Sequence, residues 1–127
     1  MAIIFLLGRL IFGGFFLNSA YSHLFKSSGM VGYARSKKVP APRLAIMGSG
    51  VLILLGSLSI ILGVYPKLGA LAIVLFLVPV SIAMHAYWNE TDPGARGMQK
   101  IQFWKNMALL GAALMTLMIV EPWAYSL

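Results

Sequence analysis

The hydrophobic and polar positions of this chain fall into long blocks rather than into a short alternating pattern. Four apolar blocks stand between polar segments, at residues 3–24, 44–64, 68–87 and 103–120. A helix needs about 20 apolar residues to cross the hydrocarbon core of a bilayer. Because a bilayer offers the backbone no hydrogen-bond partners, and the period-two alternation of barrel strands is absent, each block predicts a transmembrane helix. We expect one all-α domain, an integral membrane four-helix bundle over residues 1–127.

Composition and charge narrow the function classes. Hydrophobic residues make up 60% of the 127 positions and charged residues only 10%, whereas soluble domains carry about 25% charged residues. Four spans leave no room for a soluble catalytic domain. The net charge of +7 is explained by topology and by contact with anionic lipid, so the expected partner is the lipid membrane and not a nucleic acid. The absence of cysteine excludes disulfides and thiolate metal sites.

The basic residues predict how the helices are oriented in the membrane. The first and third connections carry Lys26, Arg35, Lys37, Lys38, Arg43, Arg96 and Lys100, whereas the turn between the second and third blocks carries only Lys67. Cytoplasmic loops of membrane proteins are enriched in lysine and arginine. We therefore expect a multi-pass membrane protein with both termini outside the cytoplasm.

The first connection, FKSSGMVGYARSKKVPAPR, predicts a short interfacial helix between the first two spans. Ser27 or Ser28 stands at the position of an N-cap, and Tyr33 adds apolar surface among the basic residues. Pro40 and Pro42 would end such a helix before the second span begins. The alternative is a loop that is basic for topology alone.

Arg9, Phe16 and His23 are spaced seven residues apart in the first block, which places them on one helix face. A charged side chain inside the membrane costs up to about 2.5–3.5 kcal/mol on insertion scales unless it finds a partner. Glu121 follows the fourth block on the same side of the membrane and is the only acidic residue there. We predict a structural ion pair between Arg9 and Glu121. The alternative is an arginine that anchors a ligand.

Polar and aromatic residues at the opposite, basic side form the candidate site. The block boundaries place six of them near one membrane depth: His23, His85, Trp88, Trp104, Lys105 and Asn106. Histidine, lysine and asparagine hydrogen-bond the carbonyl oxygens of a head group, while tryptophan packs on its ring. These six are candidate ligand-binding residues for a quinone or a lipid head group, beside the kink that Pro79 predicts in the third span.

Other interpretations of these residues stay open. An aromatic belt with interfacial histidines and a snorkelling lysine needs no ligand, and histidines on two helices are also axial ligands of haem. Two histidines without a membrane-embedded carboxylate or cysteine make a poor metal site, so no metal is expected. No set of nucleophile, base and orienting group can be assembled. Whether the chain is an enzyme is left open, and the one cofactor expected is a non-covalently bound quinone.

Four stretches, taken in order, resemble the DoxX family of small four-helix membrane proteins. They are GRLIFGGFFLNSAYSHL, GYARSKKVPAP, GSLSIILGVYPKLGALAIVLFLVPVSIAMHAYW and FWKN. The resemblance covers nearly the whole chain. It implies a protein of the bacterial cytoplasmic (inner) membrane that is linked to redox metabolism, since relatives include a subunit of thiosulfate:quinone oxidoreductase. Family members often carry an acidic residue near the start of the second span, where this chain reads AIMGSGVLILLG, so any chemistry of that carboxylate is lost here.

Three functional hypotheses follow. The first choice is an accessory or quinone-contacting subunit of a membrane redox system, with other subunits of the redox complex or a second copy of the chain as partners. The alternatives are a component of a quinone-dependent oxidoreductase and a small carrier or membrane-assembly factor. Because the sequence shows no flavin, haem or iron–sulfur motif, a redox role requires a cofactor that a partner supplies.

Overall fold

The computed structural model describes all 127 residues as helices and short connections, without a strand. Five α-helices and one turn of 3-10 helix follow in order: α1 (Ala2–Phe25), α2 (Ser28–Ser36), α3 (Pro42–Leu62), α4 (Pro66–Met84), η1 (Tyr87–Asn89) and α5 (Pro93–Thr116). The predicted all-α class is confirmed. By length and hydropathy, α1, α3 and the segment Pro66–Asn89 are long and apolar enough to cross a membrane.

The helix of the fourth apolar block begins earlier and ends sooner than predicted. α5 starts at Pro93 instead of residue 103, because the Asp92 carboxylate caps its first turn and accepts from the backbone N–H of Ala95 at 2.9 Å. Its polar first half lowers its mean hydropathy, so α5 is not among the three helices that reach the length and hydropathy of a span. α5 ends at Thr116, and the chain continues in turns and bends to Leu127.

A short helix is present in the first connection, over the residues where one was predicted. Ser27 occupies the N-cap of α2, but no side-chain hydrogen bond caps this helix. α2 ends at Ser36, before Pro40, and Pro42 is the first residue of α3. The prolines therefore stand where a helix must stop or start, as their missing N–H requires.

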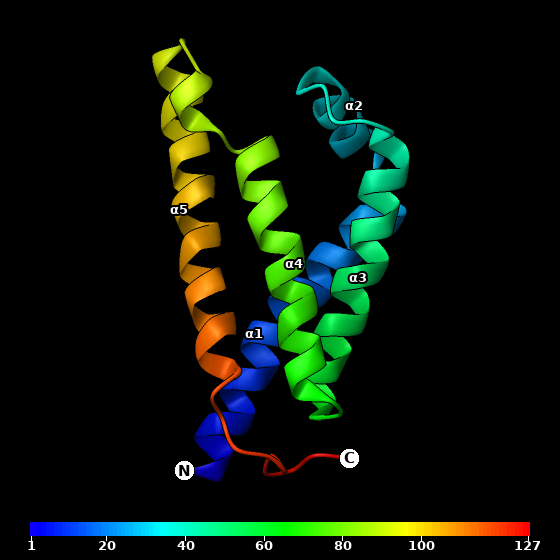
Figure 1. Ribbon diagram of the computed structural model, residues 1–127, viewed down its shortest axis with the longest axis vertical. Helices are drawn as coiled ribbons and strands as arrows, with labels where there is room; N and C mark the ends of the chain where they lie inside the picture. The colour runs from blue at the N-terminus through cyan, green and yellow to red at the C-terminus, as the bar shows by residue number, and fades with distance from the viewer.

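The helices form an elongated bundle in which α4 lies between α3 and α5, and α1 crosses behind them (Figure 1). α1 packs against α3, α3 against α4, and α4 against α5. Both termini lie at one end of the molecule, whereas α2 and the connection from α4 to α5 lie at the other (Figure 1). The two connections that carry most of the basic residues therefore share one end, which we call the basic end.

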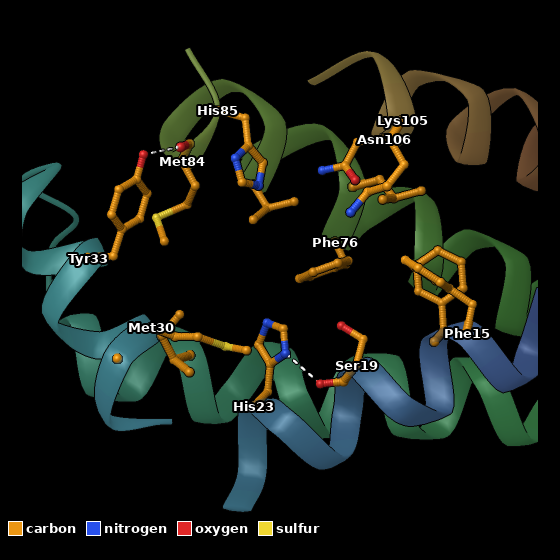
Figure 2. Close-up of a pocket in the computed structure, with 15 residues that line it drawn as sticks. Phe15, Ser19, His23, Met30, Tyr33, Phe76, Met84, His85, Lys105 and Asn106 are labelled. Carbon is orange, nitrogen blue, oxygen red and sulfur yellow. Dashed lines mark hydrogen bonds between the residues drawn. The ribbon is translucent and has the colours of Figure 1, made fainter. Parts of the chain in front are cut away.

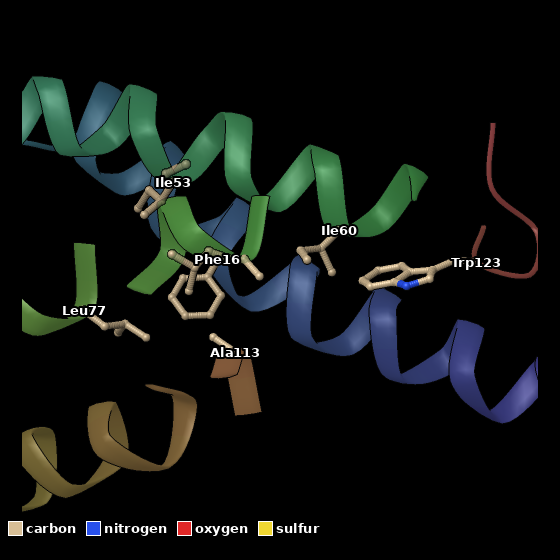
Figure 3. Packing of buried hydrophobic residues seen from close by; sticks show 9 residues of the cluster. Phe16, Ile53, Ile60, Leu77, Ala113 and Trp123 are labelled. Carbon is tan, nitrogen blue, oxygen red and sulfur yellow. The ribbon is translucent and has the colours of Figure 1, made fainter. Parts of the chain in front are cut away.

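Apolar side chains from four helices and the C-terminal segment form the core. Figure 3 shows Phe16 of α1 at its centre, near Ile53 of α3, Leu77 of α4 and Ala113 of α5. Trp123, which follows α5, is 4% exposed and belongs to the same cluster. The segment after α5 is thus packed against the bundle and is part of its core.

α3 and α4 approach each other closely through two glycines. A Cβ atom on Gly56 would lie 3.0 Å from the Gly69 carbonyl oxygen, and one on Gly69 would lie 3.0 Å from the Gly56 carbonyl oxygen. Lipid provides no hydrophobic driving force between helices, so small residues stabilise them by permitting close van der Waals contact. The turn between the two helices contains Gly63 at φ 72°, a left-handed C-cap conformation that favours glycine.

Arg9 is buried, with 3% of its surface exposed, and it caps the C-terminal end of α3. Its Nε donates to the Ile60 carbonyl at 3.1 Å and its Nη2 to the Ile61 carbonyl at 2.7 Å. These carbonyls lie in the last turn of α3, where no helical N–H remains to bond them. Nη1 donates to the carbonyl of Ala124 in the C-terminal segment. The negative end of the α3 dipole therefore stabilises the buried cation.

The predicted ion pair between Arg9 and Glu121 is wrong. The one salt bridge of the structure joins Lys37 to Glu90, and Glu121 is exposed in the segment after α5. The physical reason is that α5 ends at Thr116. The segment that follows it therefore brings backbone carbonyls to the guanidinium, and its carboxylate stays outside.

Candidate functional site

A cavity of about 380 Å³ lies at the basic end, between α1, α2, α4 and α5 (Figure 2). Four of the six predicted site residues line it: His23, His85, Lys105 and Asn106. The rest of its wall is mostly apolar. A few polar groups in a largely apolar cavity are typical of sites that bind small organic molecules. We call this space the head-group cavity.

His23 lies in the last turn of α1 and is buried on the same helix face as Arg9 and Phe16, which confirms the grouping that their spacing predicted. Its Nδ1 lies 2.7 Å from the Ser19 carbonyl oxygen. Because a carbonyl can only accept, this hydrogen bond places the ring hydrogen on Nδ1. In the neutral ring, Nε2 then keeps a free lone pair.

His85 follows the last residue of α4 and points into the cavity from the wall opposite His23 (Figure 2). Its Nδ1 lies 2.7 Å from Oε1 of Gln99 on α5. Donation to that oxygen again leaves Nε2 of the neutral ring as an acceptor. The cavity thus holds two imidazole acceptors on facing walls. The structure contains no group of three or more histidine, cysteine, aspartate or glutamate side chains that could hold a metal ion.

Lys105 and Asn106 project from α5 into the same cavity (Figure 2). The Lys105 ammonium donates to Oε1 of Gln102 at 2.7 Å, which leaves two of its three hydrogens free. Asn106 is 6% exposed, yet its side-chain amide forms no hydrogen bond within the protein and borders the cavity. An amide in a largely apolar wall is stabilised when a ligand supplies the missing hydrogen bonds.

Trp88 and Trp104 do not line the cavity. They are 46% and 56% exposed, and each packs edge to face on Phe103, with ring centroids 5.3 Å and 5.6 Å apart. The aromatic side chains that do line the cavity include Phe15 and Phe76. The exposed position of the tryptophans is the one that an aromatic belt predicts.

α2 closes one side of the cavity with Met30 and Tyr33, which the sequence pattern did not assign to the site. The Tyr33 hydroxyl donates at 3.0 Å to the carbonyl of Met84 at the C-terminal end of α4 (Figure 2). Nothing in the sequence signals this contact beyond a tyrosine in a short connecting helix. The contact depends on how α2 folds back toward α4.

A second contact holds α2 to the connection after α4. Lys37 follows α2, and its ammonium lies 2.5 Å from Oε1 of Glu90. This hydrogen bond to Glu90 raises the pKa of Lys37 above its ordinary value. A raised folded-state pKa contributes stability that is fully present below the ordinary pKa and is lost only as the pH rises through the raised one. The ion pair therefore persists throughout the neutral pH range.

Lys37→Met is expected to loosen α2 from the bundle. Partly exposed ion pairs contribute up to about 1 kcal/mol, so amide hydrogen exchange over residues 28–36 should accelerate by up to about fivefold. Lys38→Met is the matched control, because the neighbouring lysine forms no ion pair. Equal acceleration in both variants would mean that the bond to Glu90 does not hold α2 in place.

Comparisons with known proteins relate the chain to one family. Residues 4–86 match the sequence model of the DoxX family. The chain is 29% identical over 125 residues to the inner membrane protein YphA of Escherichia coli (strain K12), and the alignment covers 98% of this chain and 88% of that protein. No solved structure matches the chain. His23 and His85 lie within the matched residues, whereas Lys105 and Asn106 lie beyond them.

Proposed function

Because this chain belongs to the DoxX family, we propose that it is a multi-pass protein of the bacterial inner membrane whose head-group cavity binds a quinone. We further propose that it is an accessory, quinone-contacting subunit of a membrane redox system. The three apolar helices and the similarity to a protein named for the inner membrane support the location.

In the proposed arrangement α5 is the fourth span of a four-helix bundle and α2 is interfacial. α5 runs beside α4 (Figure 1), and its second half, from Phe103 onward, is largely apolar. The basic end faces the cytoplasm and the termini lie outside, as the positive-inside rule predicts. Each basic residue near an anionic leaflet contributes about 1 kcal/mol to the attachment of this end.

The chemistry of the cavity supports a ligand whose oxygens are carbonyls in its oxidised form and hydroxyls in its reduced form. The Lys105 ammonium and the Asn106 amide donate to a carbonyl oxygen, and Nε2 of either histidine accepts from a hydroxyl. A quinone carries carbonyls and its reduced form carries hydroxyls. Phe15 and Phe76 add aromatic surface to the wall beside a flat ring. A phosphatidylcholine head group offers acceptors alone, so it would leave both imidazoles unbonded.

The observation that best supports this proposal is that Asn106, a residue only 6% exposed, has an amide that borders the cavity without a hydrogen bond within the protein, in the same cavity as two histidines with free Nε2 atoms. The side chains of the cavity hold a head group and exchange protons with it, but none of them transfers electrons. The electrons of a redox reaction therefore come from a partner subunit. This places the chain in contact with the quinone without making it the reductase.

Titration of the purified protein in neutral detergent with a benzoquinone that lacks a side chain is expected to quench tryptophan fluorescence saturably. Asn106→Leu keeps the side chain's size but removes both polar groups, so the affinity should fall about tenfold. His85→Ala should weaken binding in the same direction.

Lys100→Met is the matched control, because Lys100 lies on α5 but does not line the cavity, and its affinity should equal that of the unmodified protein. Quenching that never saturates in the unmodified protein would refute quinone binding. Equal affinity in Asn106→Leu and Lys100→Met would remove the quinone from this cavity.

A further inference from the structure

We propose that the ligand of the head-group cavity carries one flexible apolar chain, and that this chain lies in a second cavity between α3 and α4. The inference rests on the proposed function and names the class of its ligand. That class is an amphiphile with a carbonyl-bearing ring at one end and a hydrocarbon chain at the other.

The second cavity has a volume of about 270 Å³ and lies mainly between α3 and α4, beside the C-terminal part of α2. We call it the chain cavity. Five residues line both cavities: His23, Ile46, Phe76, Val80 and Met84. The two spaces are therefore separated by a wall that is one layer of side chains thick.

The dividing wall consists of side chains that can move without a change in the backbone. The rings of His23 and Phe76 meet edge to face, with centroids 5.5 Å apart (Figure 2). Met84 belongs to the same wall, and methionine is the most adaptable of the apolar side chains. Because no helix stands between the two cavities, we expect rotation of Phe76 or Met84 to join them.

The two cavities differ in polarity. Lys105 and Asn106 line the head-group cavity alone, whereas no charged lysine, arginine, aspartate or glutamate lines the chain cavity. Apart from His23, the one polar side chain of the chain cavity is Ser49, whose hydroxyl already donates to the Ile46 carbonyl at 2.9 Å. A head group gains no hydrogen bonds in the chain cavity, whereas a hydrocarbon chain gains apolar contact there.

The chain cavity also opens where a membrane-borne ligand would arrive. Leu75, Pro79 and Ala83 line it from α4 and are exposed, so in a bilayer they face lipid. An unattached lipid chain is the other occupant that such an opening admits. The shared wall favours the chain of the bound ligand itself, because its head group already lies on the other side of His23 and Phe76.

Gly48 allows the chain cavity to be filled without disturbing the helices. It lines this cavity from α3, and a Cβ atom on it would meet nothing within 4 Å. Gly48→Leu therefore places a side chain where the ligand chain would lie. Gly14→Leu is the matched control, since Gly14 lies in α1, has the same free space and lines neither cavity. Ala83→Leu fills the same cavity from α4 and serves as a second variant.

The experiment compares two quinones that have the same ring. The first has no side chain, and the second has a ten-carbon chain. Both are titrated in the same detergent against the unmodified protein and the three variants. Partition into micelles lowers the free concentration of the long quinone equally in every titration, so it does not affect the comparison between proteins. Gly48→Leu and Ala83→Leu should lower the affinity for the long quinone about tenfold and leave the affinity for the short quinone unchanged. Gly14→Leu should change neither affinity.

The outcomes separate the two proposals. If the short quinone fails to bind the unmodified protein, the proposed function is overturned. A second outcome is that the short quinone binds but Gly48→Leu and Ala83→Leu bind the long quinone as tightly as Gly14→Leu does. The hydrocarbon chain of the ligand then lies elsewhere, and this inference is overturned. If Gly48→Leu and Ala83→Leu lower the affinity for the short quinone as well, the chain cavity is not a separate subsite and the inference is again overturned.

Discussion

Replacing Arg9 with methionine is expected to lower the free energy of unfolding by about 3 kcal/mol, because removal of one partner from a buried charged network leaves the others unpaired. Methionine keeps an unbranched apolar stem of similar reach. It leaves the carbonyls of Ile60, Ile61 and Ala124 without the donors that bind them. The guanidinium also lies 5.7 Å and 5.6 Å from the ring centroids of Phe5 and Trp123, and these cation–π contacts are lost too.

Reversible unfolding in detergent micelles, followed by circular dichroism, measures this loss. Arg9→Lys should give an intermediate value, since one ammonium cannot replace a planar fork that spans several carbonyls. Glu121→Gln should change the stability by less than about 0.5 kcal/mol, because the carboxylate is exposed. A loss in Glu121→Gln as large as that in Arg9→Met would mean that the acid, and not the end of α3, stabilises the arginine.

Gly56→Leu is expected to cost about 3 kcal/mol, at the upper end of the range for overpacked sites. A Cβ atom on Gly56 would lie 3.0 Å from the Gly69 carbonyl oxygen and 3.2 Å from Cγ1 of Ile73. A backbone carbonyl cannot move aside as a flexible side chain can, so α3 and α4 must separate and lose contact along their length. Thermal unfolding in micelles should show a markedly lower midpoint.

The control for this prediction lies on the same helix. Gly48→Leu introduces the same side chain where nothing lies within 4 Å, so its midpoint should equal or exceed that of the unmodified protein, since leucine has the better helix propensity. A midpoint for Gly56→Leu that matches Gly48→Leu would show that the two glycines do not set the distance between α3 and α4.

Hydropathy predicted three of the helices well, because apolar blocks bounded by prolines and basic residues leave little choice. The bounds of α1, α3 and α4 lie within three residues of the predicted blocks. The start of α5 was placed too late, since the apolar pattern begins at residue 103 whereas the helix begins at its cap. The dipeptide Asp92–Pro93 carried that signal, as an N-cap residue followed by proline at the first helical position.

For Arg9 the sequence predicted the burial but not the partner. Its spacing with Phe16 and His23 placed it on the buried face of α1. The acceptors are backbone carbonyls at the end of another helix, and every residue has a carbonyl, so no side-chain pattern could indicate them. Glu121 is the one carboxylate at that side of the membrane, and the end of α5 leaves it exposed.

The sequence predicts the depth of the candidate site residues in the membrane, but it does not predict which way each side chain points around its helix. A helix rises about 1.5 Å per residue, so counting from the block boundaries placed all six residues near one level. Their direction around the helix axis depends on packing. Lys105 and Asn106 point into the head-group cavity, whereas Trp104, one residue earlier, lies outside it. Tyr33 enters from α2, whose fold toward α4 no local pattern shows.

The contacts of Arg9 also bear on the order in which the protein is assembled. The guanidinium belongs to α1, which is synthesised before α3 and the C-terminal segment, and its acceptors at Ile60 and Ala124 follow 51 and 115 residues later. Until they arrive, the nascent α1 holds an unmatched cation, and the cost of inserting such a charge at a helix centre is about 2.5–3.5 kcal/mol. α1 therefore depends on segments made after it: α3 supplies the first acceptors for Arg9 and the segment beyond α5 completes the set, so a chain that stops before Ala124 is the less stable one.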